Sequence, residues 1–519
     1  MIPVEKNPIV RGWFEGRRVL VAGLGKSGAA AAGLLSRLGA RVSGTEKKSK
    51  AQSRPWLRLL PKGTSVEWGT HRFLSRPWDI VVASPGVPAS SLAPARARSI
   101  PVWGELELGY RVLALAGRWP AWSAAITGTN GKTTTTALLG AIFKSAGRPT
   151  VVAGNIGVPL CAVVNDVTAR TALALEVSSY QLETAEAFRP AVGAVLNVTP
   201  DHLARHGDME SYARAKFRLF QSQGVGDAAV LNGRDPWCRR LASSVSGQVY
   251  WFGDRSFFGP PMLSTGEKEF SSPLGRRCRE AADEGCAVVL SANQIPHPAL
   301  SQGEREKQFG GLRKLGDCFL GDGVFWDGKY ICGRGLTGRW SAPAHLPGRH
   351  NIENALAAVA CARALGVPSG AIARGLSGFR GVEHRLELVR TWNGIRFIND
   401  SKATNVDSTR VALEAFSGPL TVILGGEDKG APYSPLLPLL RKKARAVLLI
   451  GEASSKIERD LAGLRGLERC DTLARAVDRA ARSARPGEAV LLSPACASFD
   501  QFENFEHRGR CFKEFVGAL

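Results

Sequence analysis

A short glycine-rich segment of this chain carries the residue types that bind nucleotide phosphates. It follows an apolar run at 122–126 and precedes a helix-like stretch at 134–144, which is the order strand, loop, helix N-terminus. Small residues let backbone N–H groups approach a phosphate, and the helix dipole favours the anion. A lysine can neutralise the outer phosphates, and a threonine hydroxyl can reach Mg²⁺. The segment predicts an ATP site formed by Gly128, Thr129, Asn130, Gly131, Lys132, Thr133 and Thr134.

The loop departs from the common phosphate-binding pattern, because Ile126 stands where the first glycine of that pattern falls. A Gly-Lys-Thr triplet alone is often a surface turn. The flanking strand and helix favour phosphate binding over that alternative.

Two further polar residues directly follow predicted strands. Glu176 ends the apolar run 173–175, so its carboxylate could hold Mg²⁺ against a terminal phosphate or cap the next helix. His202 comes shortly after the predicted strand 192–196, where it could ligate a metal or simply begin a helix. These residues alone leave both pairs of alternatives open.

Lys216 lies on a predicted helix at 209–220, on the same face as Tyr212 and Phe220. Its ammonium could extend past this face into water. If the amine is buried, its pKa falls, and a neutral amine can react with carbon dioxide to give a carbamate. That reaction would replace a cation with a second metal-binding carboxylate.

A second glycine loop, Gly23-Leu24-Gly25-Lys26-Ser27-Gly28, lies near the N-terminus. It connects a predicted strand at 18–22 to a helix at 29–38, and the next strand, 41–44, leads into Thr45 and Glu46. Another strand at 79–83 ends at Ser84-Pro85-Gly86. This pattern is typical of a dinucleotide or uridine nucleotide site, although tight turns in an ordinary parallel sheet also fit it.

The alternation of strands, glycine turns and helices predicts an α/β fold with three domains. We expect a Rossmann-like domain at 1–112, a central P-loop-type mononucleotide-binding domain at 113–381 and a C-terminal Rossmann-like domain at 382–519. The last contains predicted strands at 421–424, 447–450 and 489–492. Residues 257–317 lack this pattern and concentrate proline, glycine and mixed charges, which favours an exposed, flexible insertion without a catalytic role.

Composition excludes several classes of protein. The 519 residues include 10 cysteines without a Cys-x-x-Cys pair, so neither a zinc site nor a disulfide framework is indicated. We find no apolar stretch long enough to span a membrane and no signal-peptide core, and we expect a cytoplasmic protein. The formal charge is +22, but the arginines are scattered and no nucleic-acid-binding motif accompanies them, so we expect no nucleic-acid partner.

Taken in order along the chain, these motifs resemble the Mur ligase family, ATP-dependent enzymes that form amide bonds in peptidoglycan precursors. The resemblance rests on 128–133, Glu176-Val-Ser-Ser-Tyr-Gln181, 197–202 and Ala213-Arg-Ala-Lys216, and it extends through 348–354 and 383–385. Stretches at 399–405, 425–429 and 492–502 are similar to the glutamate-adding branch of the family. Only 257–317 lies outside the resemblance.

The resemblance implies a role for each matching residue. Lys132, His202 and Lys216 would be catalytic, and two Mg²⁺ ions would be held by Thr133, Glu176, His202 and the carbamate of Lys216. The adenosine of ATP would contact Asn351, Asn354, Arg385 and Asp400. The UDP-linked substrate would contact Gly25, Thr45, Glu46, Ser84, Gly86 and Asn155. Glutamate would contact Lys402, Thr404, Lys429, Ser498, Phe499 and Phe505.

The implied reaction is ATP-dependent ligation of D-glutamate to UDP-N-acetylmuramoyl-L-alanine through an acyl phosphate, by a monomeric enzyme. A sibling ligase that uses L-glutamate or another amino acid is the nearest alternative, since these residues do not reveal stereochemistry. An NAD-dependent dehydrogenase would explain Gly23 to Gly28 but would leave Lys132 and Lys216 without a role. A non-catalytic nucleotide-binding scaffold would explain the charge.

Overall fold

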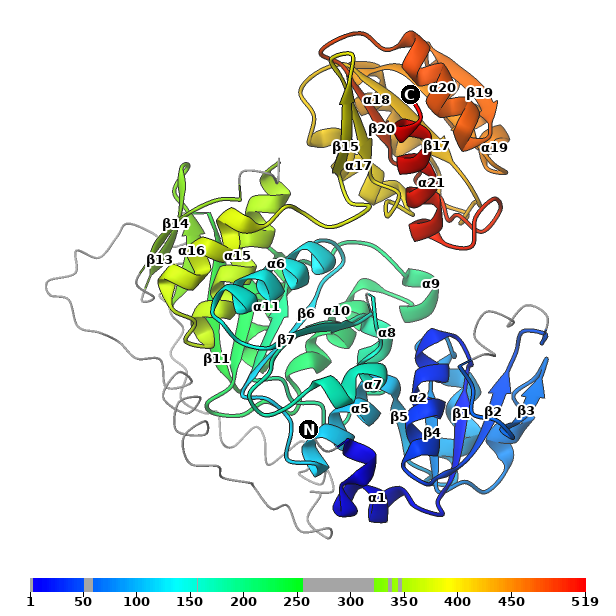
Figure 1. Ribbon diagram of the computed structural model, residues 1–519, viewed down its shortest axis with the longest axis vertical. Helices are drawn as coiled ribbons and strands as arrows, with labels where there is room; N and C mark the ends of the chain where they lie inside the picture. Colours follow the sequence, from blue (N-terminus) through cyan, green and yellow to red (C-terminus); the bar gives the residue numbers. More distant parts are fainter. Residues whose placement is uncertain (1–2, 51–58, 156, 255–321, 335–337, 344–347) are drawn as a thin grey trace, which may run out of the picture. The chain divides into compact units, whose positions relative to one another are not determined.

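The computed structural model describes residues 3–50, 59–155, 157–254, 322–334, 338–343 and 348–519 (Figure 1). The predicted insertion at 257–317 lies outside the described residues. Three largely parallel sheets confirm the predicted α/β class. The chain divides into two compact units, one of Met1–Pro343 with Glu353–Gly378 and one of Ala344–Ile352 with Phe379–Leu519.

The first sheet, blue in Figure 1, has five parallel strands in the order β3-β2-β1-β4-β5. Its central strands are continuous apolar runs because helices pack against the sheet and bury both faces. Its strands are β1 (Arg18–Ala22), β2 (Arg41–Glu46), β3 (Ser65–Trp68), β4 (Ile80–Ala83) and β5 (Val102–Gly104), and its helices include α2 (Lys26–Arg37) and α5 (Glu105–Leu115).

The turn from β1 into α2 requires glycine at two positions. Gly23 has φ +80°, a conformation that side chains with a Cβ rarely adopt. A Cβ on Gly28 would lie 1.9 Å from the carbonyl oxygen of Gly23, so only glycine allows the helix to approach the strand this closely.

The central sheet has nine strands in the order β14-β13-β12-β11-β10-β9-β6-β8-β7. Strands β12 to β14 pair antiparallel, and the others are parallel. The strands are β6 (Trp122–Thr127), β7 (Thr150–Gly154), β8 (Ala172–Glu176), β9 (Val192–Val195), β10 (Ala228–Asn232), β11 (Gln248–Asp254), β12 (Gly323–Trp326), β13 (Tyr330–Arg334) and β14 (Arg339–Ser341).

Strand β6 lies between β8 and β9, which determines where the functional side chains meet. Parallel strands end at the same edge of a sheet, so the loop after β6, Glu176 at the end of β8 and Asn197 just after β9 are neighbours. The helices of this part include α6 (Lys132–Ser145), α8 (Ser179–Leu182), α9 (Leu203–His206), α10 (Met209–Phe217), α15 (Arg349–Ala364) and α16 (Ser369–Gly378).

The C-terminal sheet has the order β15-β16-β20-β17-β18-β19, with β15 antiparallel to the rest. Its strands are β15 (Glu387–Trp392), β16 (Ile395–Asn399), β17 (Leu420–Gly425), β18 (Ala444–Ile450), β19 (Leu467–Asp471) and β20 (Ala489–Leu492). The helices are α17 (Val406–Glu414), α18 (Leu437–Lys443), α19 (Ser454–Asp460), α20 (Leu473–Ser483) and α21 (Phe505–Gly517). Because β20 separates β16 from β17, the loops that follow these three strands lie next to one another.

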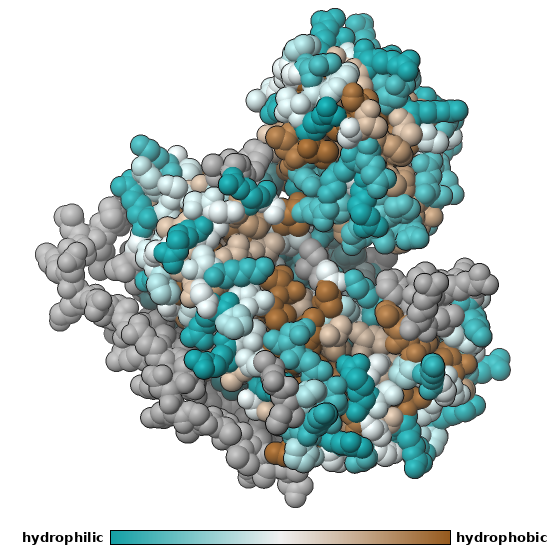
Figure 2. All heavy atoms as spheres, viewed as in Figure 1, coloured by the Kyte–Doolittle hydropathy of each residue, from teal (hydrophilic) through white to brown (hydrophobic). Residues whose placement is uncertain are grey.

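Hydrophilic side chains dominate the face of the molecule drawn in Figure 2, and apolar side chains are exposed only in separate groups. Within the part of the chain that the structure describes, no helix is both long enough and apolar enough to cross a membrane.

Candidate active site

The loop between β6 and α6 has a backbone that glycine makes possible. Gly128 and Gly131 have φ +151° and +85°. A Cβ on Gly131 would lie 2.2 Å from Oδ1 of Asn354, so a larger residue would collide there as well as strain the backbone. Gly131 is the N-cap residue of α6, and the first N–H groups of the helix therefore face the loop.

Asn197 fixes the shape of this loop from the neighbouring strand. Its Oδ1 accepts the backbone N–H of Asn130 at 2.8 Å, and its Nδ2 donates to the carbonyl of Asn130 at 3.1 Å. The backbone N–H of Thr129 also donates to the carbonyl of Asn197 at 2.9 Å. The backbone N–H and carbonyl of Asn130 thus help to hold the loop in shape.

Lys132 lies against the loop that precedes it. Its Nζ donates to the carbonyl oxygens of Gly128 at 2.8 Å and Thr129 at 2.7 Å. The ammonium group therefore lies beside the loop in which the phosphates are predicted to bind.

Glu176 joins the phosphate loop to the strand on its other side. Its carboxylate is 2% exposed and accepts hydrogen bonds from Oγ1 of Thr133 at 2.7 Å and from Nδ2 of Asn155 at 2.9 Å. Helix α8 is capped by Ser178, which forms a capping box with Gln181, so the interpretation of Glu176 as a helix cap is wrong. A carboxylate and a hydroxyl together are the oxygen ligands that Mg²⁺ prefers.

Lys216 is 1% exposed, so the interpretation in which its ammonium reaches water is wrong. Its Nζ lies 4.3 Å from the centre of the Tyr212 ring. Burial, together with the positive charge of Lys132, holds the pKa of Lys216 well below its usual value. The structure thus supplies a condition that assists carbamate formation, a buried amine whose charged form is disfavoured.

His202 is the N-cap residue of α9 with φ +55°, which confirms that it begins a helix. Its Nε2 lies 3.5 Å from Oδ2 of Asp201, and its ring centre lies 6.4 Å from that of Tyr212. His202 and Lys216 therefore both lie beside Tyr212. The described part of the chain contains no group of three or more His, Cys, Asp or Glu side chains placed to hold a metal.

Three residues predicted to bind the UDP-linked substrate form hydrogen bonds that shape the first sheet. Glu46 accepts the backbone N–H of Leu24 at 2.7 Å, and the buried hydroxyl of Thr45 donates to the carbonyl of Thr70 at 2.8 Å. Ser84 donates to the carbonyl of Gly23 at 2.6 Å. Gly25 is half-buried and Gly86 is exposed in the loops after β1 and β4.

Lys26, which sequence reasoning missed, connects the first glycine loop to the central sheet. Its Nζ donates to the carbonyl of Gly157, two residues after Asn155. The only signal in the sequence was its place inside the glycine loop.

In the second unit, predicted nucleotide and glutamate residues line one pocket: Arg385, Asp400 and Lys402, together with His350. Asp400 accepts a hydrogen bond from the Ser493 hydroxyl at 2.8 Å, and burial raises the pKa of its carboxyl to about 7. The other two predicted adenosine residues, Asn351 and Asn354, are buried on α15.

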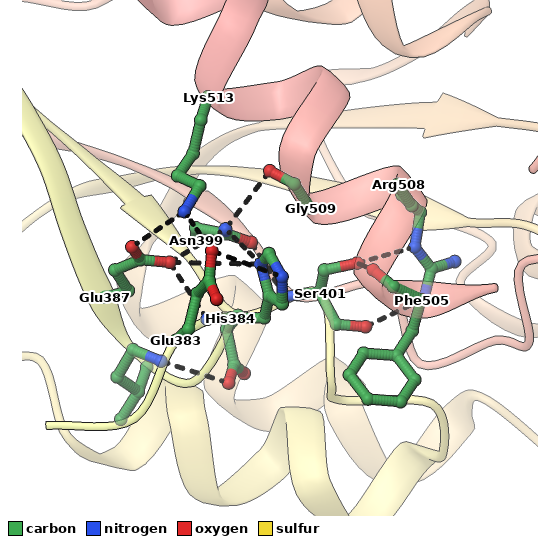
Figure 3. A network of polar contacts seen from close by, with 11 residues as sticks. Glu383, His384, Glu387, Asn399, Ser401, Phe505, Arg508, Gly509 and Lys513 are labelled. Carbon is green, nitrogen blue, oxygen red and sulfur yellow. Dashed lines mark hydrogen bonds and ion pairs between the residues drawn. The ribbon is translucent and has the colours of Figure 1, made fainter. Parts of the chain in front are cut away.

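The segment that leads into the second unit is attached to α21 (Figure 3). Lys513 bridges Glu383 and Glu387, and Nδ2 of Asn399 lies 3.0 Å from Nδ1 of His384. The backbone N–H of Lys402 donates to the carbonyl of His384 at 3.1 Å, so this segment also supports the loop that carries Lys402.

The six residues predicted to bind glutamate come from three loops and the start of α21. Nζ of Lys402 lies 5.6 Å from the Phe505 ring, and the backbone N–H of Thr404 donates to the carbonyl of Lys402. Ser498 is buried, whereas Lys429 is exposed and Phe499 is 69% exposed.

Arg508 was missed by sequence reasoning although it is buried beside these loops. It stands on the same helical face as the buried Phe512, and a charge on an apolar helical face was the signal that could have revealed it.

Comparisons with known proteins agree with this architecture. Residues 126–258 match the family model of the Mur ligase middle domain, and residues 384–496 match that of the Mur ligase glutamate ligase domain. The sheets and the phosphate loop place the chain in the class of α/β ATP-dependent ligases.

Full-length relatives give the family. Proteins named UDP-N-acetylmuramoylalanine--D-glutamate ligase from Koribacter versatilis and Anaeromyxobacter dehalogenans are 42% and 43% identical, over 97% of this chain and 98% of each relative. The relative of that name from Myxococcus xanthus is 41% identical over 98% of this chain and 99% of its own length. The chain belongs to the Mur ligase family, as the motifs predicted.

Solved structures show the same fold at low identity. The UDP-N-acetylmuramate-alanine ligase MurC from Thermotoga maritima is 17% identical, with a TM-score of 0.54, over 97% of this chain and 99% of that one. A structure of MurF from Acinetobacter baumannii is 18% identical, with a TM-score of 0.55, over 96% and 93%.

Proposed function

We propose that this chain ligates D-glutamate to UDP-N-acetylmuramoyl-L-alanine with the conversion of ATP to ADP and phosphate. The observation that carries the proposal is the buried amine of Lys216 beside Lys132, next to a phosphate loop whose Thr133 hydroxyl is bonded to Glu176. Full-length similarity to ligases of that name supports the choice of substrates. The reaction would be a cytoplasmic step of peptidoglycan precursor synthesis, carried out by a monomer.

We assign one task to each predicted domain. Residues 1–112 would form a Rossmann-like domain that binds the UDP moiety at its glycine loop. Residues 113–381 would bind ATP, and residues 382–519 would form a Rossmann-like domain that binds glutamate and part of the nucleotide. In each case, proposed residues lie at the ends of the parallel strands, which is where ligands bind in such sheets.

The residues present fit Mg²⁺. Thr133 and Glu176 offer a hydroxyl and a buried carboxylate 2.7 Å apart, and Mg²⁺ commonly combines such ligands with substrate phosphates and water. We place a second ion at His202 and carbamylated Lys216. When bound, magnesium ions would neutralise charge on the transferring phosphoryl group.

Carbamylation of Lys216 would follow from its burial. The lone pair of the neutral amine nitrogen forms a bond to the carbon of CO₂, one C=O π bond breaks as its electron pair moves to oxygen, and the nitrogen releases a proton to solvent. The negative charge then lies on the carbamate oxygens. The positive charge of Lys132, which helps to lower the pKa of the Lys216 amine, would then attract the carbamate.

The chemistry proceeds in two transfers. An oxygen of the alanyl carboxylate attacks the γ-phosphorus of ATP, the bond to the bridging oxygen breaks, and ADP leaves with an acyl phosphate formed. Lys132 spreads the charge that develops on the phosphoryl oxygens. The glutamate amine then attacks the acyl carbon, loses a proton and expels phosphate, while Lys402 and Lys429 pair with the glutamate carboxylates.

The decisive experiment measures ADP release with UDP-N-acetylmuramoyl-L-alanine and a panel of D- and L-amino acids. We expect release to require D-glutamate, to disappear in Lys132→Ala and to persist in the matched control Lys144→Ala, an exposed residue of the same helix. Release with L-glutamate or another amino acid instead would identify a sibling ligase. Nucleotide binding without turnover of any amino acid would identify a scaffold.

A further inference from the structure

Arg508 is a fully buried arginine on α21 whose guanidinium binds the protein backbone (Figure 3). Its Nε donates to Oγ of Ser401 at 3.0 Å, and its two terminal nitrogens donate to the carbonyls of Ser401 at 2.9 Å, Ala497 at 3.1 Å and Cys496 at 3.2 Å. No carboxylate of the described residues forms an ion pair with it. Burial lowers the pKa of Arg508 to about 10, so it stays protonated at neutral pH.

Three loops of the C-terminal sheet converge on this guanidinium. Ser401 follows β16, and Cys496 and Ala497 follow β20. The loop after β17 joins them, because a Cβ on Gly426 would lie 3.1 Å from the guanidinium of Arg508 and 2.2 Å from the carbonyl oxygen of Ala497.

The loops after β17 and β20 are also bonded directly to each other. Glu427 and Ala497 exchange two backbone hydrogen bonds, each of 3.1 Å. The guanidinium, bonded to Ala497 on one side and to Ser401 on the other, therefore ties the loop after β16 to this pair.

These loops carry the residues that we assign to glutamate. Lys402 and Thr404 follow Ser401, Lys429 follows Gly426, and Ser498 and Phe499 follow Ala497. Phe505 is the first residue of α21, and its carbonyl accepts a hydrogen bond from Ser401 Oγ at 2.8 Å. Every proposed glutamate residue thus belongs to a segment attached to Arg508 or to its helix.

Burying a guanidinium costs free energy, because the charge loses its hydration, and an apolar side chain of similar volume would avoid this penalty. The five donors of a guanidinium, however, lie on three nitrogens of one rigid plane, so it can hold carbonyls of separate loops at fixed directions, whereas a lysine donates from a single nitrogen and an apolar residue does not donate at all.

We infer that Arg508 is a positioning residue for the amino-acid substrate, which sets the spacing of Lys402, Lys429 and Ser498 by joining the loops that carry them. This inference rests on the proposed function. Arg508 is inaccessible to the substrate, so it acts through the loops.

The test compares Michaelis constants for Arg508→Lys and the parent enzyme. Lysine keeps the charge but cannot bond both loops in the same fork, so we expect the KM for D-glutamate to rise by about 10-fold or more. The KM for UDP-N-acetylmuramoyl-L-alanine should stay within about 2-fold, because the first sheet belongs to another part of the fold. The KM for ATP should rise less than that for D-glutamate, because the proposed phosphate contacts lie in the loop after β6 and only part of the nucleotide is assigned to the C-terminal loops. A purely structural defect would instead change all three constants or lower the active fraction.

Two controls make the outcome decisive. Arg510→Lys changes an exposed residue of the same helix and should leave all three constants unchanged. Ser401→Ala removes one acceptor of Arg508 without changing charge and should raise the KM for D-glutamate by a smaller factor, non-additively with Arg508→Lys. An unchanged KM for D-glutamate in a folded, active Arg508→Lys enzyme would overturn the inference. A parent enzyme that releases no ADP with D-glutamate would refute the proposed function itself.

Discussion

The phosphate loop and the C-terminal loops solve the same problem of backbone strain in different ways. In the phosphate loop, the positive φ angles belong to Gly128 and Gly131, which adopt them without steric cost. In the C-terminal unit, the end of β17 and the loop after it use glycine in the same way, at Gly425 and Gly426 with φ +121° and +135°. Ala495, His384 and Leu386, however, have φ +61°, +63° and +46°, although each has a side chain that disfavours this conformation.

The difference lies in what stabilises each loop. Glycine makes the phosphate loop locally permissible, and Asn197 completes it from the next strand. The strained residues of the C-terminal unit depend on distant partners: Ala495 donates its N–H to the carbonyl of Ala403 at 2.9 Å, and His384 is bonded to Asn399. Glycine thus permits the backbone conformation of the phosphate loop, whereas tertiary contacts must hold Ala495 and His384 in a conformation that their side chains disfavour.

The largest effect is expected at Lys216, because catalysis near the phosphate loop depends on charge as well as on the shape of the backbone. Lys216→Ala should remain folded and lose ADP release by about 10³-fold, because a metal-binding carbamate disappears beside the reacting phosphates. Lys216→Arg should fail equally, since a guanidinium stays charged and does not form the carbamate. Both are measured with saturating substrates and Mg²⁺.

The carbamate can also be tested by replacement. Acetate added to Lys216→Ala should restore part of the activity by supplying carboxylate oxygens, whereas chloride at equal ionic strength should not. If Lys216→Arg releases ADP as fast as the parent enzyme, the carbamate has no role. The backbone geometry of the phosphate loop would then be enough to explain its function.

Asp400 adds a second difference between the two regions. Its buried carboxyl makes the stability of the C-terminal unit depend on pH. Its pKa is raised by burial to about 7, above its unfolded value, so the folded state favours the protonated form. The stability that Asp400 contributes is therefore full at low pH and is lost as pH rises toward 7. Asp400→Asn removes this dependence.

We expect the unfolding free energy of Asp400→Asn, relative to the parent, to increase by about 3 kcal/mol from about pH 5 to about pH 8. Urea unfolding of both proteins at the two pH values measures it. The exposed Asp478→Asn, which changes the charge by the same amount, is the matched control. A relative stability that does not vary with pH would show that Asp400 is ionised in the folded protein throughout this range.

Lys429 tests whether exposed residues of the C-terminal loops bind substrate. Lys429→Ala should raise the KM for D-glutamate by about 10- to 100-fold, which corresponds to about 1.5–3 kcal/mol for a charged hydrogen bond. Lys442→Ala, another exposed lysine of the same unit, should not change it. Equal glutamate dependence in all three enzymes would restrict the glutamate site to the buried loops.

This contrast also explains which features of the structure could be predicted from the sequence. The strands at 18–22, 122–126 and 489–492 and the phosphate loop were predictable because residues adjacent in sequence carry their patterns. The bonds from Asn197 that complete the phosphate loop, 67 positions away, were not. The bonds between Arg508 and Ser401 were not either, because they join residues 107 positions apart. The burial of Lys216 was suggested by helical periodicity, but its proximity to Lys132 depends on how two helices pack.

The smallest expected effect is at Ala495, and it tests the contrast directly. Glycine at 495 removes the left-handed strain, worth about 1–2 kcal/mol, and adds about 0.5–1 kcal/mol of chain entropy to the unfolded state. At Ala497 in the same loop, which has no positive φ, glycine brings the entropic loss and, as at Ala495, the loss of a buried methyl group, but it relieves no strain. Ala495→Gly should therefore be about 1–2 kcal/mol more stable to urea than Ala497→Gly, with the parent close to or between them. If both variants lose the same stability, Ala495 is not strained, and the C-terminal loops then resemble the phosphate loop in having a backbone that their own residues accept.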